Sequence, residues 1–158
     1  MRQLAVFDVD GVVADVRHRL HHLARRPRNW GRYFAGAGRD PALETGVAMA
    51  LEYARDHELV WLTGRPENLR EVTEQWLARH GLPVAELIMR PYGDRRPARE
   101  YKAARLLRLA ERGDVRIVVD DDPAVVSMLT EAGWPVRLAD WVPYEEALRE
   151  AQEREGRT

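Results

Sequence analysis

The sequence has no cysteine, a single lysine and no long apolar run. Without cysteine there can be no disulfide, thiolate metal site, iron–sulfur cluster or cysteine nucleophile, so any metal has to be bound by oxygen or imidazole. No segment approaches the roughly 18 apolar residues of a membrane span, and the chain begins directly with a strand-like segment. These absences predict a cytoplasmic protein and disfavour secretion or membrane insertion.

The charge of the chain is nearly balanced but unevenly distributed. The 158 residues include 25 basic and 26 acidic side chains, and the net charge of −1 argues against a uniformly basic nucleic-acid binder. Two stretches are nevertheless rich in arginine, 11–40 with seven and 90–116 with eight. Lys102, the only lysine beside 24 arginines, lies in the second stretch, and a compact ammonium is not equivalent to a planar guanidinium near a phosphoryl group. The length predicts one domain that spans residues 1–158.

Five short apolar segments are typical of buried strands, and helical patterns separate them. We expect strands at 3–9, 58–62, 86–89, 115–119 and 135–138. We expect helices around 15–25 and at 42–56, 66–80, 97–111, 123–132 and 143–155, the last as a solvated acidic tail. This alternation predicts an α/β fold with a doubly wound, Rossmann-like, five-stranded parallel sheet and helices on both faces.

The segment 15–41 is the expected substrate-binding or short cap region, because its part 26–41 is the only long irregular stretch. It leaves no room for a large cap domain, so the sequence predicts an open site. Three of its residues have helical metal-ligand spacing, His18, His21 and His22; they can bind zinc, contact a substrate or have no direct role. Three aromatic residues either stack on a base or anchor the segment to the core: Trp30, Tyr33 and Phe34.

Polar residues follow four of the expected strands. They are Asp8 and Asp10; Thr63, Gly64 and Arg65; Arg90; and Asp120, Asp121 and Asp122. The carboxyl ends of parallel strands form the ligand-binding edge of such a sheet, so we expect these groups to lie together. Clustered carboxylates repel one another unless they hold a divalent cation, and oxygen ligands favour Mg²⁺. The expected ligands are Asp8, Asp10, Asp121 and Asp120. The run Asp120-Asp121-Asp122 leaves the choice among its three acids ambiguous, and we favour Asp121, with Asp120 second.

The same edge carries groups suited to phosphoryl transfer. Thr63 and the Gly64 N–H can bind a phosphate, helped by the dipole of a helix that opens at Pro66. A carboxylate at Asp8 can attack phosphorus, and Asp10, two residues further, can protonate the leaving oxygen and then activate water. Lys102 would supply a fixed positive charge at the reacting group.

Four ordered motifs resemble those of the haloacid dehalogenase (HAD) superfamily of phosphatases. They are FDVDGV at 7–12, LTGR at 62–65, Lys102, and VVDDD at 118–122. The stretch from Met89 to Lys102 is similar to the phosphatase domain of bacteriophage-type polynucleotide kinase-phosphatases. This resemblance implies Mg²⁺-dependent removal of 3′-phosphates from nucleic-acid ends or nucleotides, with Arg65 and Arg90 as substrate-binding residues.

Two other functions fit the same residues. The chain can be a HAD phosphatase for a small metabolite, or a non-hydrolytic phosphate-responsive module, although Asp10 argues against the latter because such a module has no use for a leaving-group acid. No GxxxxGK[ST] motif occurs, so the sequence holds no kinase half, and a separate kinase or ligase partner remains open.

Overall fold

A single parallel sheet forms the centre of the molecule. The computed structural model describes all 158 residues. The strands are β1 (Gln3–Phe7), β2 (Glu58–Pro66), β3 (Glu86–Arg90), β4 (Asp114–Asp120) and β5 (Val136–Leu138). All pairs are parallel, in the order β3-β2-β1-β4-β5, so β1 is central and the chain reverses its direction across the sheet at this strand. The predicted fold class is confirmed.

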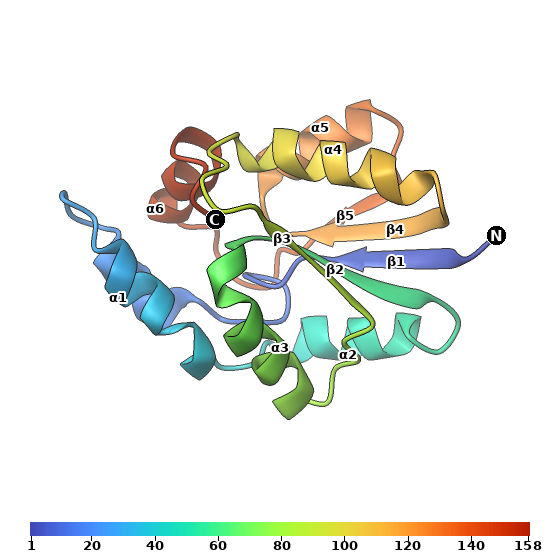
Figure 1. The fold of residues 1–158 in the computed structure, drawn as a ribbon, viewed down its shortest axis with the longest axis horizontal. Helices are drawn as coiled ribbons and strands as arrows, with labels where there is room; N and C mark the ends of the chain where they lie inside the picture. The colour runs from blue at the N-terminus through green and yellow to red at the C-terminus, as the bar shows by residue number, and fades with distance from the viewer.

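Helices cover both faces of the sheet (Figure 1). One face packs against α2 (Glu44–Tyr53) and α3 (Arg70–Arg79), and the other against α4 (Ala98–Ala110) and α5 (Pro123–Glu131). Alternate residues of β1 supply the two cores: Phe7 packs with Trp61 and Trp76, whereas Val6 packs with the cluster under α4 and α5. Burial of β1 on both faces explains its continuous apolar sequence.

The segment between β1 and α2 contains no separate cap domain, as predicted. It consists of a 3₁₀ helix η1 (Arg17–His22), α1 (Trp30–Ala35) and a second 3₁₀ turn η2 (Ala37–Arg39). The helix expected around 15–25 is therefore shorter, and the stretch 26–41 is not wholly irregular, because Asn29 caps α1 by accepting a hydrogen bond from the Arg32 N–H at 3.1 Å.

The end of the chain departs most from its prediction. Instead of a solvated helix, it forms α6 (Glu146–Arg149) and a π-helical turn η4 (Glu150–Arg154) that pack on the segment 15–41. Leu148 and Ala151, three residues apart on one helix face, are buried against Leu20 and Leu23. The abundant charges concealed this apolar contact. None of the helices combines the length and apolar character that crossing a membrane requires.

Candidate active site

Three carboxylates meet where β1 and β4 end. Phe7 pairs with Val119 in the sheet, so Asp8 and Asp120 follow at neighbouring positions, and the Asp8 N–H donates to the Val119 carbonyl at 2.9 Å. Asp8, Asp120 and Asp121 each place a carboxylate oxygen within 4.8 Å of the others, and all three are buried. We call these three residues the acid cluster.

Lys102 is the cation of the acid cluster. It lies in α4 and is 2% exposed, with Nζ 2.5 Å from Asp120 Oδ2 and 3.1 Å from Asp8 Oδ2. Although burial disfavours its charge, the neighbouring carboxylates raise the pKa of Lys102 above its ordinary value. Lys102 is therefore a permanent positive charge beside Asp8.

One ammonium does not neutralise three buried carboxylates. Burial raises the pKa of Asp8 to about 8; Lys102 opposes this shift, and Asp120 and Asp10 add to it. Burial, with repulsion from Asp8 and Asp120, likewise holds the pKa of Asp121 well above its ordinary value. Without a further cation, the acid cluster retains protons that an ordinary carboxyl would have lost.

The donors of the acid cluster fit a hard divalent cation. Both oxygens of Asp120 have partners, Lys102 and the N–H of Asp122, whereas Asp121 Oδ1 is buried without any hydrogen-bond partner. A Cβ at Gly11 would lie 1.9 Å from Asp121 Oδ2, and Gly11 has φ +75°, so only glycine is accommodated here. An all-oxygen set with one unsatisfied buried oxygen is suited to Mg²⁺.

Asp122 has a different local role from its two neighbours. Its side chain caps α5 by accepting from the Ala124 N–H at 2.9 Å. Burial and the nearby Glu153 raise the pKa of Asp122 to about 7. This cap accounts for the third acid of the DDD motif.

The side chain of Asp10 is directed to Arg65, and Asp10 does not join the acid cluster. Asp10 Oδ1 accepts from Arg65 Nε at 2.9 Å and Nη2 at 2.6 Å, and Arg19 lies 3.5 Å away. Burial alone would raise the pKa of Asp10, but Arg65 and Arg19 outweigh it and lower the value. Its expected role as a metal ligand stays a prediction.

The guanidinium of Arg65 is occupied within the protein. Besides Asp10, it donates to Thr73 Oγ1 at 3.0 Å and Asp40 Oδ2 at 2.9 Å, and Arg65 is 1% exposed. Asp40 also accepts a bidentate pair from Arg19, with both distances 2.8 Å. We call Asp10, Arg19, Asp40 and Arg65 the ionic network.

The pairing of Arg19 with Asp40 was not predicted from the sequence, in which Arg19 was a candidate for phosphate contact. They lie 21 residues apart and in different short elements, so no periodicity links them. A weak signal was present, because Asp40 is the only acid in the stretch 26–41, which carries four arginines.

Thr63, Gly64 and Arg90 converge at the end of β2 and β3. Thr63 Oγ1 accepts from the Arg65 N–H at 3.1 Å, and the Gly64 carbonyl accepts from Arg90 Nε at 3.1 Å. Arg90 is fully buried, donates to the backbone oxygens of Arg96 and Thr158, and forms an ion pair with Asp94 at 3.7 Å. This long ion pair leaves part of the charge of Arg90 uncompensated beside Gly64, which suits the side chain to an anion.

This loop departs from its prediction in two ways. β2 continues through Pro66, and the helical region after it begins with the 3₁₀ turn η3 (Glu67–Leu69) and becomes α-helical only at α3. The prediction of an open site is also wrong. Thr158 lies on Gly64, because a Cβ there would be 2.3 Å from the Thr158 carbonyl carbon, and Asp8 and Thr63 are 3% and 1% exposed.

The remaining sequence candidates surround the site. His18 Nε2 lies 2.6 Å from Asp40 Oδ1, whereas the rings of His21 and His22 pack on each other, and the three form no metal-binding group. Tyr33 is buried beneath the Arg19 guanidinium, and Trp30 stacks on Phe34. These contacts favour an anchoring role for the aromatic residues over base stacking.

Comparisons with known proteins agree with this geometry. Residues 2–138 match the family described as the polynucleotide kinase PNKP phosphatase domain. None of the curated protein sequences matches the chain.

Solved structures share the fold. A chain from a structure of the Pnkp1/Rnl/Hen1 complex is similar with a TM-score of 0.75 at 22% identity, over 91% of this chain and 48% of that chain. This chain therefore spans about half the length of that relative. The class C acid phosphatase of Bacillus anthracis with tungstate bound gives 0.64 at 13% identity, over 95% of this chain and 77% of that one.

A more distant relative was solved with the ligands of interest. The HAD family enzyme bt-2542 of Bacteroides thetaiotaomicron, in complex with magnesium and inorganic phosphate, gives a TM-score of 0.52 at 8% identity, covering 94% and 99% of the two chains. At these identities the structural likeness shows the fold alone, whereas the family match covers most of the sequence. Together with the acid cluster on a HAD-type sheet, it shows that the chain belongs to the PNKP phosphatase domain family of HAD-type phosphatases.

Proposed function

We propose that the protein is a Mg²⁺-dependent phosphomonoesterase that removes 3′-phosphates from nucleic-acid ends or nucleotides through an aspartyl-phosphate on Asp8. The observation that carries the proposal is the buried contact of Asp8 with Lys102, 3.1 Å apart, within a cluster that has an unsatisfied carboxylate oxygen. The family match and the relatives in an RNA-repair complex support the class of substrate.

In the first step, an oxygen of Asp8 attacks phosphorus, and the bond from phosphorus to the leaving oxygen breaks. Lys102 Nζ stabilises the charge that develops on the transferred group. Mg²⁺ bound by Asp8, Asp120 and Asp121 would offset the repulsion between the Asp8 carboxylate and the phosphate. The proposed phosphate ligands are Thr63, the Gly64 N–H and Arg90.

Asp10 would handle the proton in both steps. Its lowered pKa keeps it ionised at rest, and the arrival of a phosphate dianion raises its pKa by like-charge repulsion, so that Asp10 takes up one proton from solvent. The protonated Asp10 gives its proton to the leaving alkoxide, and the resulting carboxylate then takes a proton from the water that attacks the aspartyl-phosphate. Breakage of the bond between phosphorus and Asp8 releases phosphate. Arg65, held by Asp10 and Asp40, acts as a positioning residue in this scheme.

Phosphate release from a matched panel tests the proposal. The panel holds a 3′-phosphorylated oligonucleotide, its 5′-phosphorylated twin, a 3′-mononucleotide and a sugar phosphate, each with Mg²⁺ and with a chelator. We expect Mg²⁺-dependent release that favours the 3′-phosphates. Asp8→Asn, which keeps the size of the side chain, should abolish turnover while preserving the circular dichroism spectrum. Turnover by this variant within a few-fold of wild type would refute the assignment of Asp8 as the nucleophile. Preference for the sugar phosphate would indicate a metabolite phosphatase.

A further inference from the structure

Two adjoining cavities lie outside the acid cluster and are lined by arginine. Their volumes are about 480 Å³ and 160 Å³, and they share Trp30, Arg95 and Arg157. The larger also reaches Arg26, Arg28 and the carboxylate of Glu155. The smaller reaches Tyr92 and Pro66. We call the two together the arginine groove.

Two cations of the groove lack a carboxylate partner. Arg26 and Arg28 both pair with Glu150 and Glu155. Neither Arg95 nor Arg157 forms an ion pair, and the guanidinium of Arg95 donates only to the Asp94 carbonyl, at 3.3 Å. Burial and the proximity of Arg95 lower the pKa of Arg157. Two guanidiniums that repel each other across a cavity are stabilised by an anion between them.

The backbone holds these two arginines on one rim. A Cβ at Gly156 would lie 2.1 Å from the Arg95 carbonyl oxygen, and the residue has φ +57°, so the last residues of the chain press directly on the loop that carries Arg95. The Arg157 guanidinium lies 4.6 Å above the Trp30 ring, whose stacking on Phe34 fixes it in turn. Trp30 thus positions the Arg157 guanidinium, and its ring is not free to stack on a base.

Tyr92 is the free aromatic side chain of the groove. It is 80% exposed and lies in the same loop as Arg95. An aromatic face in water beside unpaired arginines is the combination on which single-stranded nucleic acids bind, because bases stack on the ring and phosphates pair with the cations.

The groove adjoins the proposed phosphate-binding loop. Pro66, in its wall, directly follows Arg65, and Thr158, next to Arg157, lies on Gly64. Because Thr158 covers Gly64, a terminal phosphate reaches this loop only when the last residues of the chain move aside, and its preceding nucleotides would then lie beside the arginine groove.

We propose that the arginine groove binds the backbone of a single-stranded nucleic acid, with phosphodiesters on Arg95 and Arg157 and a base on Tyr92. The strand is the remainder of the substrate, so the inference rests on the proposed function and names the residues that would select a polymer end over a mononucleotide.

Binding without turnover tests the groove separately from the chemistry. Fluorescence anisotropy would measure the Kd of the full chain for a ten-nucleotide single strand with a 3′-hydroxyl, as DNA and as RNA, across a range of salt concentrations. Arg95→Ala should weaken binding about tenfold and reduce the slope of log Kd against log salt by roughly 0.7, the value of one released counterion on a single strand. Tyr92→Leu should weaken binding about tenfold with the salt slope unchanged, since it removes stacking only.

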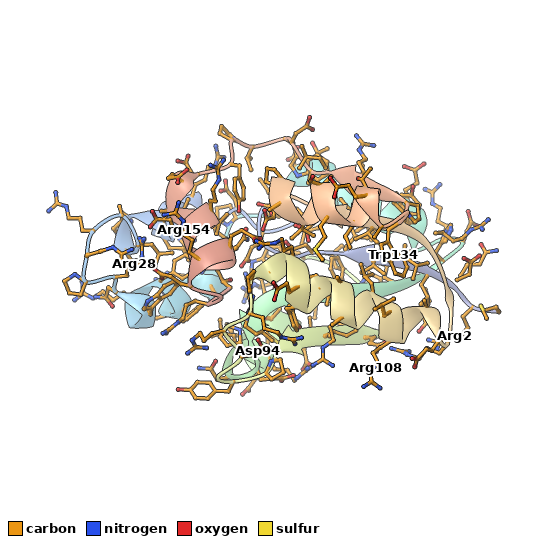
Figure 2. The ribbon with its side chains drawn as sticks, turned by 90° about the horizontal axis from the view of Figure 1, so that it is seen from above. Arg2, Arg28, Asp94, Arg108, Trp134 and Arg154 are labelled. Atoms are coloured by element: carbon orange, nitrogen blue, oxygen red, sulfur yellow. The ribbon has the colours of Figure 1, made fainter.

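Arg108→Ala is the matched control, because this exposed arginine of α4 lies at the other end of the molecule from Arg28 and Arg154 (Figure 2). It should change the Kd by less than about twofold. Equal changes in Kd for Arg95→Ala and Arg108→Ala, or no strand binding by the wild type, would refute the proposal that the arginine groove binds the strand. Strand binding through Arg95 without phosphate release from the panel would leave the groove standing and refute the proposed function. Phosphate release that is equal for oligonucleotide and mononucleotide and insensitive to Arg95→Ala would leave the proposed phosphatase activity standing and refute strand binding by the arginine groove.

Discussion

Replacement of Arg65 by alanine separates a structural role of this side chain from direct substrate binding. The resemblance to the family implies that Arg65 binds substrate, yet its guanidinium already donates to Asp10, Asp40 and Thr73 and is shielded from solvent. If these contacts are its main function, Arg65→Ala has to destabilise the fold as well as reduce turnover.

The structure sets the expected size of the loss. Removal of one partner from a buried ion pair costs about 3–5 kcal/mol, because the remaining charge is left uncompensated. Arg19 stays 2.8 Å from Asp40 and 3.5 Å from Asp10 and compensates part of that charge. We therefore expect Arg65→Ala to lower the free energy of unfolding by about 3 kcal/mol near pH 7, at the lower end of that range.

The pH dependence gives a second measure of the same contact. Although burial alone would raise the pKa of Asp10, Arg65 and Arg19 lower it below the ordinary 3.8. A lowered folded-state pKa contributes stability that is complete above the unfolded value and is lost as the pH falls below it. The difference in stability between wild type and Arg65→Ala should therefore shrink on acidification towards and below pH 4.

Urea unfolding followed by tryptophan fluorescence measures both effects, with Arg108→Ala as the control that removes an exposed arginine. The control should change stability by less than about 0.5 kcal/mol. A loss below about 1 kcal/mol for Arg65→Ala, together with a large loss of turnover, would refute the structural reasoning. That result would assign Arg65 to the substrate.

Three further predictions concern the acid cluster and Arg90. Lys102→Arg should lower kcat on the order of 100-fold, because the buried position fits an ammonium and not a wider fork; an unchanged kcat would contradict this. Burial raises the pKa of Asp8 to about 8, so the stability this carboxyl contributes is complete below pH 3.8 and is lost as the pH rises towards 8. Mg²⁺ should consequently raise Tm more at pH 8 than at pH 5.5, and calorimetry showing the opposite order would exclude a metal on these carboxylates. Arg90→Ala should raise KM for a 3′-phosphorylated oligonucleotide more than for an aryl phosphate, and equal effects on the two substrates would remove its role in substrate recognition.

The convergence of Asp8, Asp120 and Lys102 was predictable from the sequence. Each follows or faces the carboxyl end of a strand, and parallel topology brings such ends to one edge whatever the details of packing. The pattern of apolar segments is sufficient to predict a parallel sheet with helices on both faces, because a strand buried on both faces has a recognisable sequence, but it does not give the order of the strands.

The contacts that surround the acid cluster were not predictable in the same way. Asp40 meets Arg19 and Arg65 only because η1, η2 and β2 pack together, and no repeat or spacing encodes this packing. The burial of Leu148 and Ala151 was hidden for a related reason, since a helix with few apolar positions among many charges resembles a solvated one until its partner is known. Side-chain pairing between irregular segments depends on tertiary structure that local patterns do not specify.

The ionic network and the acid cluster give two nearby aspartates opposite properties. Asp8 and Asp10 are separated by one residue, yet burial beside other carboxylates raises the pKa of Asp8, whereas the guanidiniums of Arg65 and Arg19 lower that of Asp10. A pair of carboxyls whose environments shift their pKa values apart is what a division of labour in phosphoryl transfer requires. The charge of Asp8 depends on a cation brought to the acid cluster, and that of Asp10 on arginines within the fold. Loss of metal and loss of Arg65 should therefore impair different steps, nucleophilic attack in the first case and proton transfer in the second.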